Sequence, residues 1–213
     1  MPCPCQFFLG ASAPLRPIFR PDSCHNPRMT RIKGFAIRGV LKQVKTAGGG
    51  GIPAVLAALP EGAKGHFARS IVNSNWYPYE AFAGLLEAVD NALGRDDPGL
   101  MARFGRTSGR EDFGTIFKVI AAIASVEMVL KRGAVFWGQY CDGGTFEMID
   151  IVPGQGTAKL VNFPTVSARH CRLIEGWIRG IGEAVGAKNI SVAQTRCVHK
   201  GDSWCEYQMT WEK

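Results

Sequence analysis

The sequence lacks the long, uncharged apolar run that a membrane-spanning helix needs. Its longest apolar stretch covers residues 116–130 and is interrupted by Lys118, Ser125 and Glu127, so it falls short of the ~20 residues that span a bilayer. The first residues also lack the basic start and the extended apolar segment of a secretory signal. We therefore expect no integral membrane segment and a cytoplasmic location.

Acidic residues are missing from one part of the chain only. The formal net charge is +7, but residues 29–45 carry five Lys and Arg and no acid, whereas residues 46–213 carry 17 basic and 17 acidic residues. Because the body is neutral, we expect no nucleic-acid partner. The N-terminal cations are compatible with contact to anionic lipid or nucleic acid, but a solvated helix face is the more frequent explanation. They are Arg31, Lys33, Arg38, Lys42 and Lys45.

Motifs of catalysis are absent as well. The run Gly48–Gly51 lacks the Gly-Lys-Ser/Thr ending of a phosphate loop, and the chain has neither Gly-x-Ser-x-Gly nor His-Glu-x-x-His. His170 adjoins Cys171 and His199 lies near Cys197. Adjacent residues of a helix or strand point in different directions, so neither pair is a catalytic dyad by itself. We expect no enzyme.

Cysteines are too few and too scattered for a disulfide framework. There are seven, an odd number, which fits reduced thiols in a cytoplasm. A hairpin would place Cys197 beside Cys205, with Cys171 at the start of the adjacent helix. These three thiols either converge as a zinc site or pack as ordinary core residues. Three ligands are one short of a structural zinc site, so we predict no metal; if one is present, they are its ligands.

The first 28 residues differ from the rest of the chain. They contain six of the twelve prolines and three of the seven cysteines, and they show no periodicity. We interpret them as a disordered leader, or as residues upstream of a true translation start at Met29. Residues 29–213 form a single domain that is long enough to bury a large core without staples.

The hydrophobic pattern changes from helical to alternating along the chain. The first half predicts helices, and the second half predicts hairpin, helix, hairpin. We therefore predict an α+β fold in which a helical N-terminal half packs on a four-stranded antiparallel sheet. The expected helices cover residues 30–45 (or a strand leading into a helix), 53–60, 61–72, 79–93, 97–104, 113–131 and 165–186. The expected strands cover residues 145–151, 158–163, 188–198 and 203–211.

Two aromatic clusters are candidates for a ligand pocket. Trp76, Tyr77, Trp137 and Tyr140 each combine an apolar ring with a polar tip, which is the mixture that lines small-molecule sites. The other interpretation is that these rings are simply part of the core. We predict that they bind a hydrophobic small molecule or a lipid.

A family resemblance rests on the C-terminal third. The pattern Cys171-x4-Gly176-x3-Gly180, followed by Thr195-Arg196-Cys197-x3-Gly201-x3-Cys205-Glu206-Tyr207 and Trp211, resembles the vinyl-reductase-type (4-vinyl reductase) ligand-binding domain. That family shares a superfamily with the heme–nitric-oxide-binding domains and the TRAPP trafficking subunits. Upstream, Leu56-Ala57-Ala58-Leu59-Pro60, Trp76-Tyr77-Pro78 and Gly143-Gly144 resemble an uncharacterised bacterial family of the same superfamily.

The resemblance implies a non-enzymatic sensory domain that binds a small molecule or lipid and signals through protein contacts, plausibly as a homodimer. The alternative is a ligand-free adaptor or assembly protein of the trafficking-subunit type. Zinc-binding relatives carry an acidic ligand shortly before the counterpart of Cys197, where this chain has Ala193, Gln194 and Thr195. Heme-binding relatives carry Tyr-x-Ser-x-Arg, which is absent here. The resemblance thus implies no cofactor. The missing acidic ligand argues against zinc, although zinc stays possible, and the missing Tyr-x-Ser-x-Arg run argues against heme.

Overall fold

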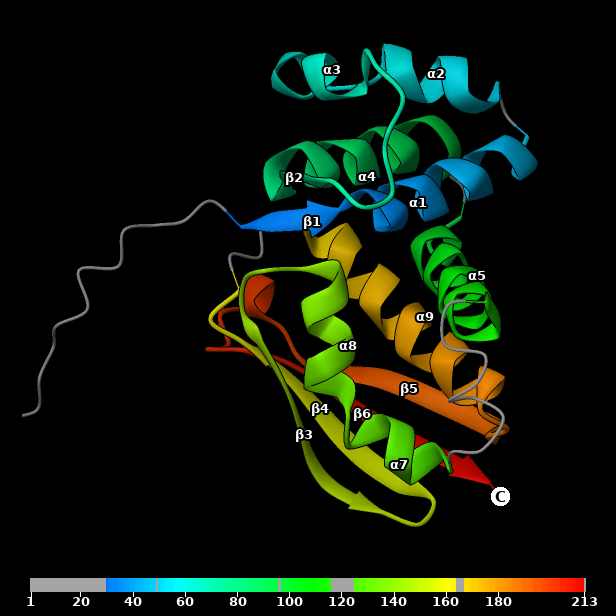
Figure 1. Cartoon of the computed structure of the whole chain (residues 1–213), viewed down its shortest axis with the longest axis vertical. Coiled ribbons are helices and arrows are strands. Elements are labelled where there is room, and N and C mark those ends of the chain that lie inside the picture. The colour runs from blue at the N-terminus through cyan, green and yellow to red at the C-terminus, as the bar shows by residue number, and fades with distance from the viewer. Residues whose placement is uncertain (1–29, 49, 96, 116–124, 164–166, 213) are drawn as a thin grey trace, which may run out of the picture.

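The structure of this chain is a computed structural model that describes residues 30–48, 50–95, 97–115, 125–163 and 167–212. The first half is mainly helical (Figure 1). Its elements are β1 (Arg31–Lys33), α1 (Gly34–Thr46), α2 (Gly51–Ala57), α3 (Glu61–Phe67), β2 (Trp76–Pro78), α4 (Tyr79–Leu93) and α5 (Leu100–Thr115). The second half contains α7 (Val126–Leu130), α8 (Gly133–Tyr140), β3 (Thr145–Val152), β4 (Gln155–Val161), α9 (Ala168–Ala184), β5 (Lys188–Arg196), a 3-10 turn (Val198–Lys200) and β6 (Cys205–Glu212).

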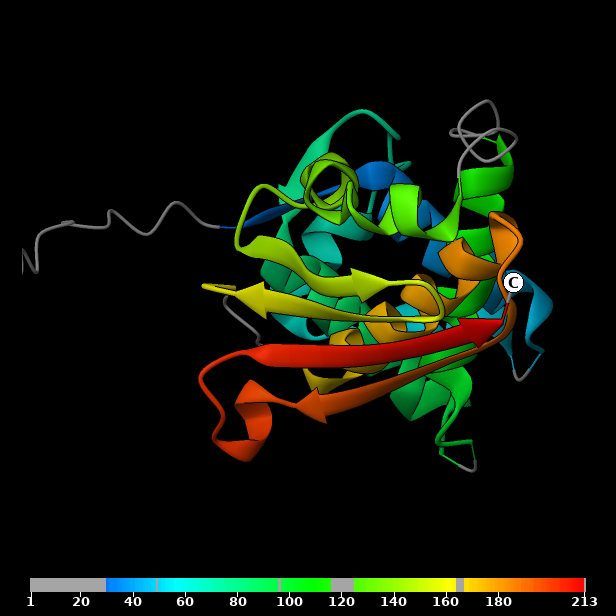
Figure 2. The same ribbon diagram turned by 90° about the horizontal axis from the view of Figure 1, so that it is seen from below.

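The four long strands form one antiparallel sheet in the order β3-β4-β6-β5. Side chains of β6 alternate between the two faces of this sheet: Cys205, Tyr207, Met209 and Trp211 are buried, and the residues between them are not. This period of two is the pattern of a sheet with one covered face. Figure 2 shows the four strands in front of the helices, with α9 behind them.

Helix α9 lies in the middle of the molecule because its apolar residues recur at helical spacing. Its buried side chains include Leu173, Ile174, Trp177 and Ile181, which form one stripe along the helix. Helices α4 and α5 pack against α9 from the side opposite the sheet, and α1 packs on α5. The core therefore has helices above α9 and strands below it.

Glycines bring α5 and α9 unusually close together. A Cβ atom added at Gly105 or Gly109 of α5 would lie within 3.0 Å of the α9 backbone, and a Cβ at Gly176 or Gly180 would do the same to the α5 backbone. Real Cβ atoms do not approach other atoms this closely. Only glycine permits this contact between the two helices.

The structure confirms the predicted α+β fold with its four-stranded antiparallel sheet. Helix α4 has the predicted bounds, and residues 30–45 form a strand followed by a helix. The helix predicted to start at Asp97 and end near residue 104 is wrong in its length, because α5 continues to Thr115. The helix predicted over 113–131 lies partly outside the described residues. The predicted leader, residues 1–28, lies wholly outside them. Within the described residues, no helix has the length and apolar character needed to cross a membrane.

Candidate functional site

A small cavity of about 40 Å³ lies between α1, α8 and α9. Its wall is almost entirely apolar and draws on five helices and on β1. It is formed by Ile32, Phe35, Ala36, Gly39, Val40, Phe82, Ser108, Asp112, Trp137, Tyr140, Cys141, His170, Leu173, Ile174 and Trp177. A single water needs a cavity of about 10–15 Å³, so this space holds only a few molecules of the size of water.

His170 is the most unusual residue of this wall. It is only 3% exposed, and its Nδ1 is 2.7 Å from the hydroxyl oxygen of Tyr79. Aromatic rings surround the imidazole, with Phe82 in an edge-on contact at 5.4 Å and Trp137 stacked at 6.3 Å between centroids. Burial lowers the pKa of His170 to about 3. The imidazole is therefore neutral at physiological pH, which is the form that can ligate a metal.

The polar part of the cavity wall lies on α5 and α8. The hydroxyl of Tyr140 donates a hydrogen bond to Asp112, and burial raises the pKa of Asp112 to about 6. One further polar atom of this wall, Ser108 Oγ, is buried without a hydrogen-bond partner among the described residues. Buried polar groups are nearly always paired, so a bound ligand or water would satisfy it.

The four aromatic residues predicted to bind a ligand lie in two different places. Trp137 and Tyr140 line the cavity. Trp76 is half-buried on β2, where the ammonium of Lys33 lies 4.1 Å from its ring centroid. Tyr77, also on β2, accepts a hydrogen bond from the backbone N–H of Val72. The structure does not bring this second pair to the cavity.

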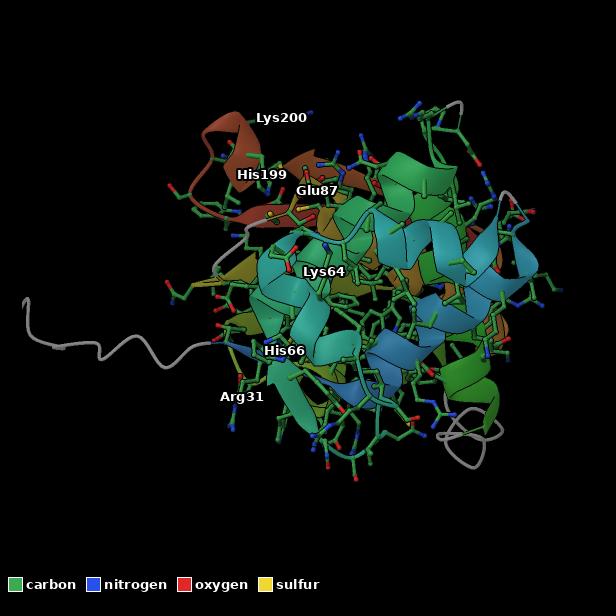
Figure 3. All side chains as sticks on the ribbon, turned by 90° about the horizontal axis from the view of Figure 1, so that it is seen from above. Arg31, Lys64, His66, Glu87, His199 and Lys200 are labelled. Carbon is green, nitrogen blue, oxygen red and sulfur yellow. The ribbon has the colours of Figure 1, made fainter. Side chains whose placement is uncertain are left out.

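Sequence reasoning did not include His170 among the candidate pocket residues, although its position contains a usable signal. His170 precedes Leu173, Ile174 and Trp177 by three, four and seven residues. Residues at these spacings share one face of a helix, so His170 belongs to the buried stripe of α9. The exposed His66 and His199, which Figure 3 shows on one face of the molecule, have no such relation to an apolar stripe.

The three predicted thiols do converge. The sulfurs of Cys171, Cys197 and Cys205 lie within 4.8 Å of one another and all three side chains are buried. The Cys171 and Cys205 sulfurs are 3.8 Å apart, and the hydrogen bond from Cys171 lowers the pKa of the Cys205 thiol. Among the described residues, no further His, Cys, Asp or Glu joins the cluster. That it holds no metal stays a prediction.

Comparisons with known proteins find a relation in structure only. No known family model matches the sequence, and no curated protein matches it. An H-NOX protein from S. oneidensis in the Fe(II)NO state shares 14% identity, with a TM-score of 0.64 over 85% of this chain and 100% of that protein. An unliganded Fe(II) H-NOX protein from K. algicida shares 12% identity, with a TM-score of 0.60 over 85% of this chain and 97% of that protein.

A third similar structure is an oxygen-binding H-NOX domain related to soluble guanylate cyclases. It shares 13% identity with this chain, with a TM-score of 0.60 over 85% of this chain and 96% of that domain. A further similar structure comes from work on heme distortion in the H-NOX family.

These findings correct two expectations. The resemblance to vinyl-reductase-type domains and trafficking subunits is wrong, because the similar structures are H-NOX domains. The residues on which that resemblance rested have roles in packing. Gly176 and Gly180 allow the close contact with α5, and Cys171, Cys197 and Cys205 are buried.

The expectation of no cofactor, with heme unfavourable, is also wrong, since the domains that share this fold are described in iron-ligated and oxygen-bound states. At 12–14% identity the similarity establishes the fold, and this chain has the fold of H-NOX domains.

Proposed function

We propose that this chain is a sensory domain whose ligand is heme, which His170 would hold at the cavity between α1, α8 and α9. The observation that carries the proposal is a buried, neutral histidine in the wall of a cavity, in a chain with the fold of H-NOX domains. Histidine is the axial ligand of many heme proteins.

The donor chemistry around His170 fits a metal ligand. Histidines that bind metals usually donate their second ring N–H to a hydrogen-bond partner, which fixes the ring and its tautomer. Here Nδ1 faces the Tyr79 hydroxyl. When Nδ1 carries the proton and donates to Tyr79, Nε2 keeps the lone pair that an iron atom needs. Heme bound in this way would supply an iron for a diatomic gas, as in the Fe(II)NO and oxygen complexes of the similar structures.

The volume of the cavity adds a condition. About 40 Å³ is far below the roughly 300–1,000 Å³ of ordinary cofactor sites, so a porphyrin enters only if the wall opens. The aromatic side chains Phe35, Trp137 and Tyr140 fill the space between α1, α8 and α9. Uptake of heme would therefore change how these helices pack, and such a change is what a sensor passes on.

The test is a titration of the purified chain with hemin, followed by the Soret absorbance. We expect one heme per chain with the spectrum of a histidine-ligated iron. His170→Ala should lose that spectrum, and Tyr79→Phe should weaken binding by about 10–100-fold, as for other supporting partners of metal-bound histidines. The matched control is His66→Ala, because His66 is exposed on α3 (Figure 3). A wild type that takes up no heme, or a His170→Ala variant with an unchanged spectrum, overturns the proposal.

We further infer that the domain acts through protein contacts and not through catalysis. In support, the chain has the fold of H-NOX domains, which the similar structures describe in NO-bound and oxygen-bound states. Dimerisation is the simplest contact for a domain of this kind, and sedimentation of the heme-loaded and heme-free chain would test it. A lipid ligand in the cavity has no comparable support, because the similar structures are H-NOX domains described in Fe(II)NO and oxygen-bound states.

A further inference from the structure

A second, much larger depression lies on the outer side of α1. It has a volume of about 740 Å³ and runs between α1, α2 and the segment that follows α3. We call it the basic groove. Its floor consists of Leu41, Ile52, Leu56, Phe67 and Ile71, and its cationic residues are Arg38, Lys42, Lys45 and Arg69.

The sequence of α1 explains why one helix supplies both a core face and a charged face. Ile37, Val40 and Val44 are buried. Arg38, Lys42 and Lys45 follow one another at spacings of four and three and are exposed, so they lie along one side of the helix. After α1 the chain reverses through Gly48, Gly50 and Gly51, all with left-handed backbone angles, a conformation that glycine adopts readily. This reversal places α2 beside α1.

Acids balance only part of the positive charge in the groove. Lys42 forms an ion pair with Glu111 at 2.8 Å, and the carboxyl of Asp112 at the groove's edge accepts the Tyr140 hydroxyl. Arg38, Lys45 and Arg69 have no ion pair within the described residues. The groove therefore carries an excess of positive charge above an apolar floor.

The floor is unusually accessible for side chains of its kind. Leu56 is 38% exposed, and Leu41, Ile52 and Phe67 are only partly buried. Apolar surface left open within a concave depression marks an interaction site. The volume falls in the range of small-molecule sites, and three cations beside such a floor complement a molecule with one anionic end and one apolar end.

We propose that the basic groove binds a fatty acid, with the carboxylate held by Arg38, Lys45 and Arg69 and the alkyl chain on the apolar floor. A small amphiphile fits a concave site lined on both sides, whereas a flat membrane surface would meet only the exposed cations. The site is separate from the proposed heme ligand, because His170 does not line it.

The groove nevertheless shares a wall with the cavity. Phe35, Gly39 and Asp112 border both, and the ring of Phe35 lies edge-on to Tyr140 at 4.7 Å between centroids. A fatty acid in the groove would therefore contact the side chains that must move for the cavity to open. A fatty acid in the groove would thus affect the opening of the cavity from the surface, in addition to the ligand bound inside it.

The experiment compares ligands that differ only at the head. The full chain is titrated by calorimetry with dodecanoate and dodecyltrimethylammonium, each below its micelle concentration, and with 1-dodecanol below its solubility limit. We expect dodecanoate to bind at one site per chain, and the alcohol and the cation to bind at least about tenfold more weakly, as for loss of a charge-assisted interaction. Raising the salt concentration should weaken dodecanoate alone.

Variants then locate the site. Arg38→Gln combined with Arg69→Gln should weaken dodecanoate by about tenfold or more, while Lys64→Gln on the exposed side of α3 (Figure 3) should leave it unchanged. Because all these residues are exposed, the variants should melt like the wild type. Equal binding of alcohol and acid, no binding, or binding that only an acidic peptide or anionic vesicles show would overturn the proposal. Repeating the titration with His170→Ala separates it from heme binding.

Discussion

His170 ties the protonation state of the molecule to its folding. The unfolded chain has the ordinary histidine pKa of about 6.5, whereas burial lowers the pKa in the folded protein to about 3. Between these two values the unfolded state binds a proton that the folded state does not. This histidine therefore makes the free energy of unfolding fall as the pH falls from about 6.5 towards 3.

The difference between wild type and His170→Gln should depend on pH accordingly. Gln keeps a polar partner for the Tyr79 hydroxyl but does not titrate. We expect the wild type to lose its advantage in unfolding free energy at up to ~1.4 kcal/mol per pH unit below 6.5. Urea unfolding at pH 7, 6, 5 and 4 measures this. The opposite titration of Asp112, whose pKa is raised to about 6, is present in both proteins and cancels. A difference that stays constant with pH would contradict the assignment.

At the scale of elements, the contact between α5 and α9 depends on the absence of side chains. Gly176→Ala would place a Cβ against the carbonyl oxygen of Ala102, and backbone cannot move aside as a flexible side chain does. We expect this variant to lose ~1–3 kcal/mol or more of unfolding free energy, as for other overpacked sites. Gly138→Ala on α8 is the matched control, because nothing lies within 4 Å of its added Cβ. This control should be neutral or gain ~0.5–1 kcal/mol. Chemical denaturation of both variants tests the contact, and equal stabilities would refute it.

The same contact explains which elements could be predicted from the sequence. Helix α4 has a regular apolar stripe that includes Phe82, Leu85, Leu86 and Val89, so local spacing is enough to define it. Helix α5 contains Gly105 and Gly109 within a polar stretch, and glycine disfavours helices in isolation. Its full length depends on packing against α9. A tertiary contact of this kind leaves no regular apolar stripe in its own segment, only two glycines at a spacing of four.

The candidate site was predictable to a similar, partial extent. The aromatic content of α8 pointed to Trp137 and Tyr140, which do line the cavity. Trp76 and Tyr77 have the same aromatic character, but β2 pairs with β1, and in this position neither residue lines the cavity. Which of two aromatic clusters faces a cavity is decided by strand pairing and helix packing between distant segments. Composition cannot make that distinction.

At the scale of the whole molecule, Trp137 joins the helical half to the sheet. Its indole N–H donates to the backbone oxygen of Gly143 at 2.9 Å, and its ring stacks on Phe146 of β3. Trp137→Ala should cost ~3–5 kcal/mol of unfolding free energy, as for other buried aromatic residues, and should widen the cavity. Thermal melts measure the first effect and uptake of a hydrophobic fluorescent probe the second. A small loss of stability would mean that the ring is not close-packed.

At this scale the structure shows where the cations of residues 29–45 lie. The sequence alone favoured a solvated helix face for the cations of residues 29–45. In the structure, Arg38, Lys42 and Lys45 border a wide groove, while Arg31 and Lys33 lie against Trp76. Charges that are neighbours in sequence therefore serve two different surfaces.

The glycine contact between α5 and α9 also divides the molecule mechanically. Because no layer of side chains separates α5 from α9, these two helices should move together as one rigid unit, and the packing of α9 on β5 adds the sheet to that unit. Helices α1 and α8 contact the rigid unit through side chains that can change rotamer. A ligand that enlarges the cavity should therefore displace α1 and α8 and leave α5, α9 and the sheet in place.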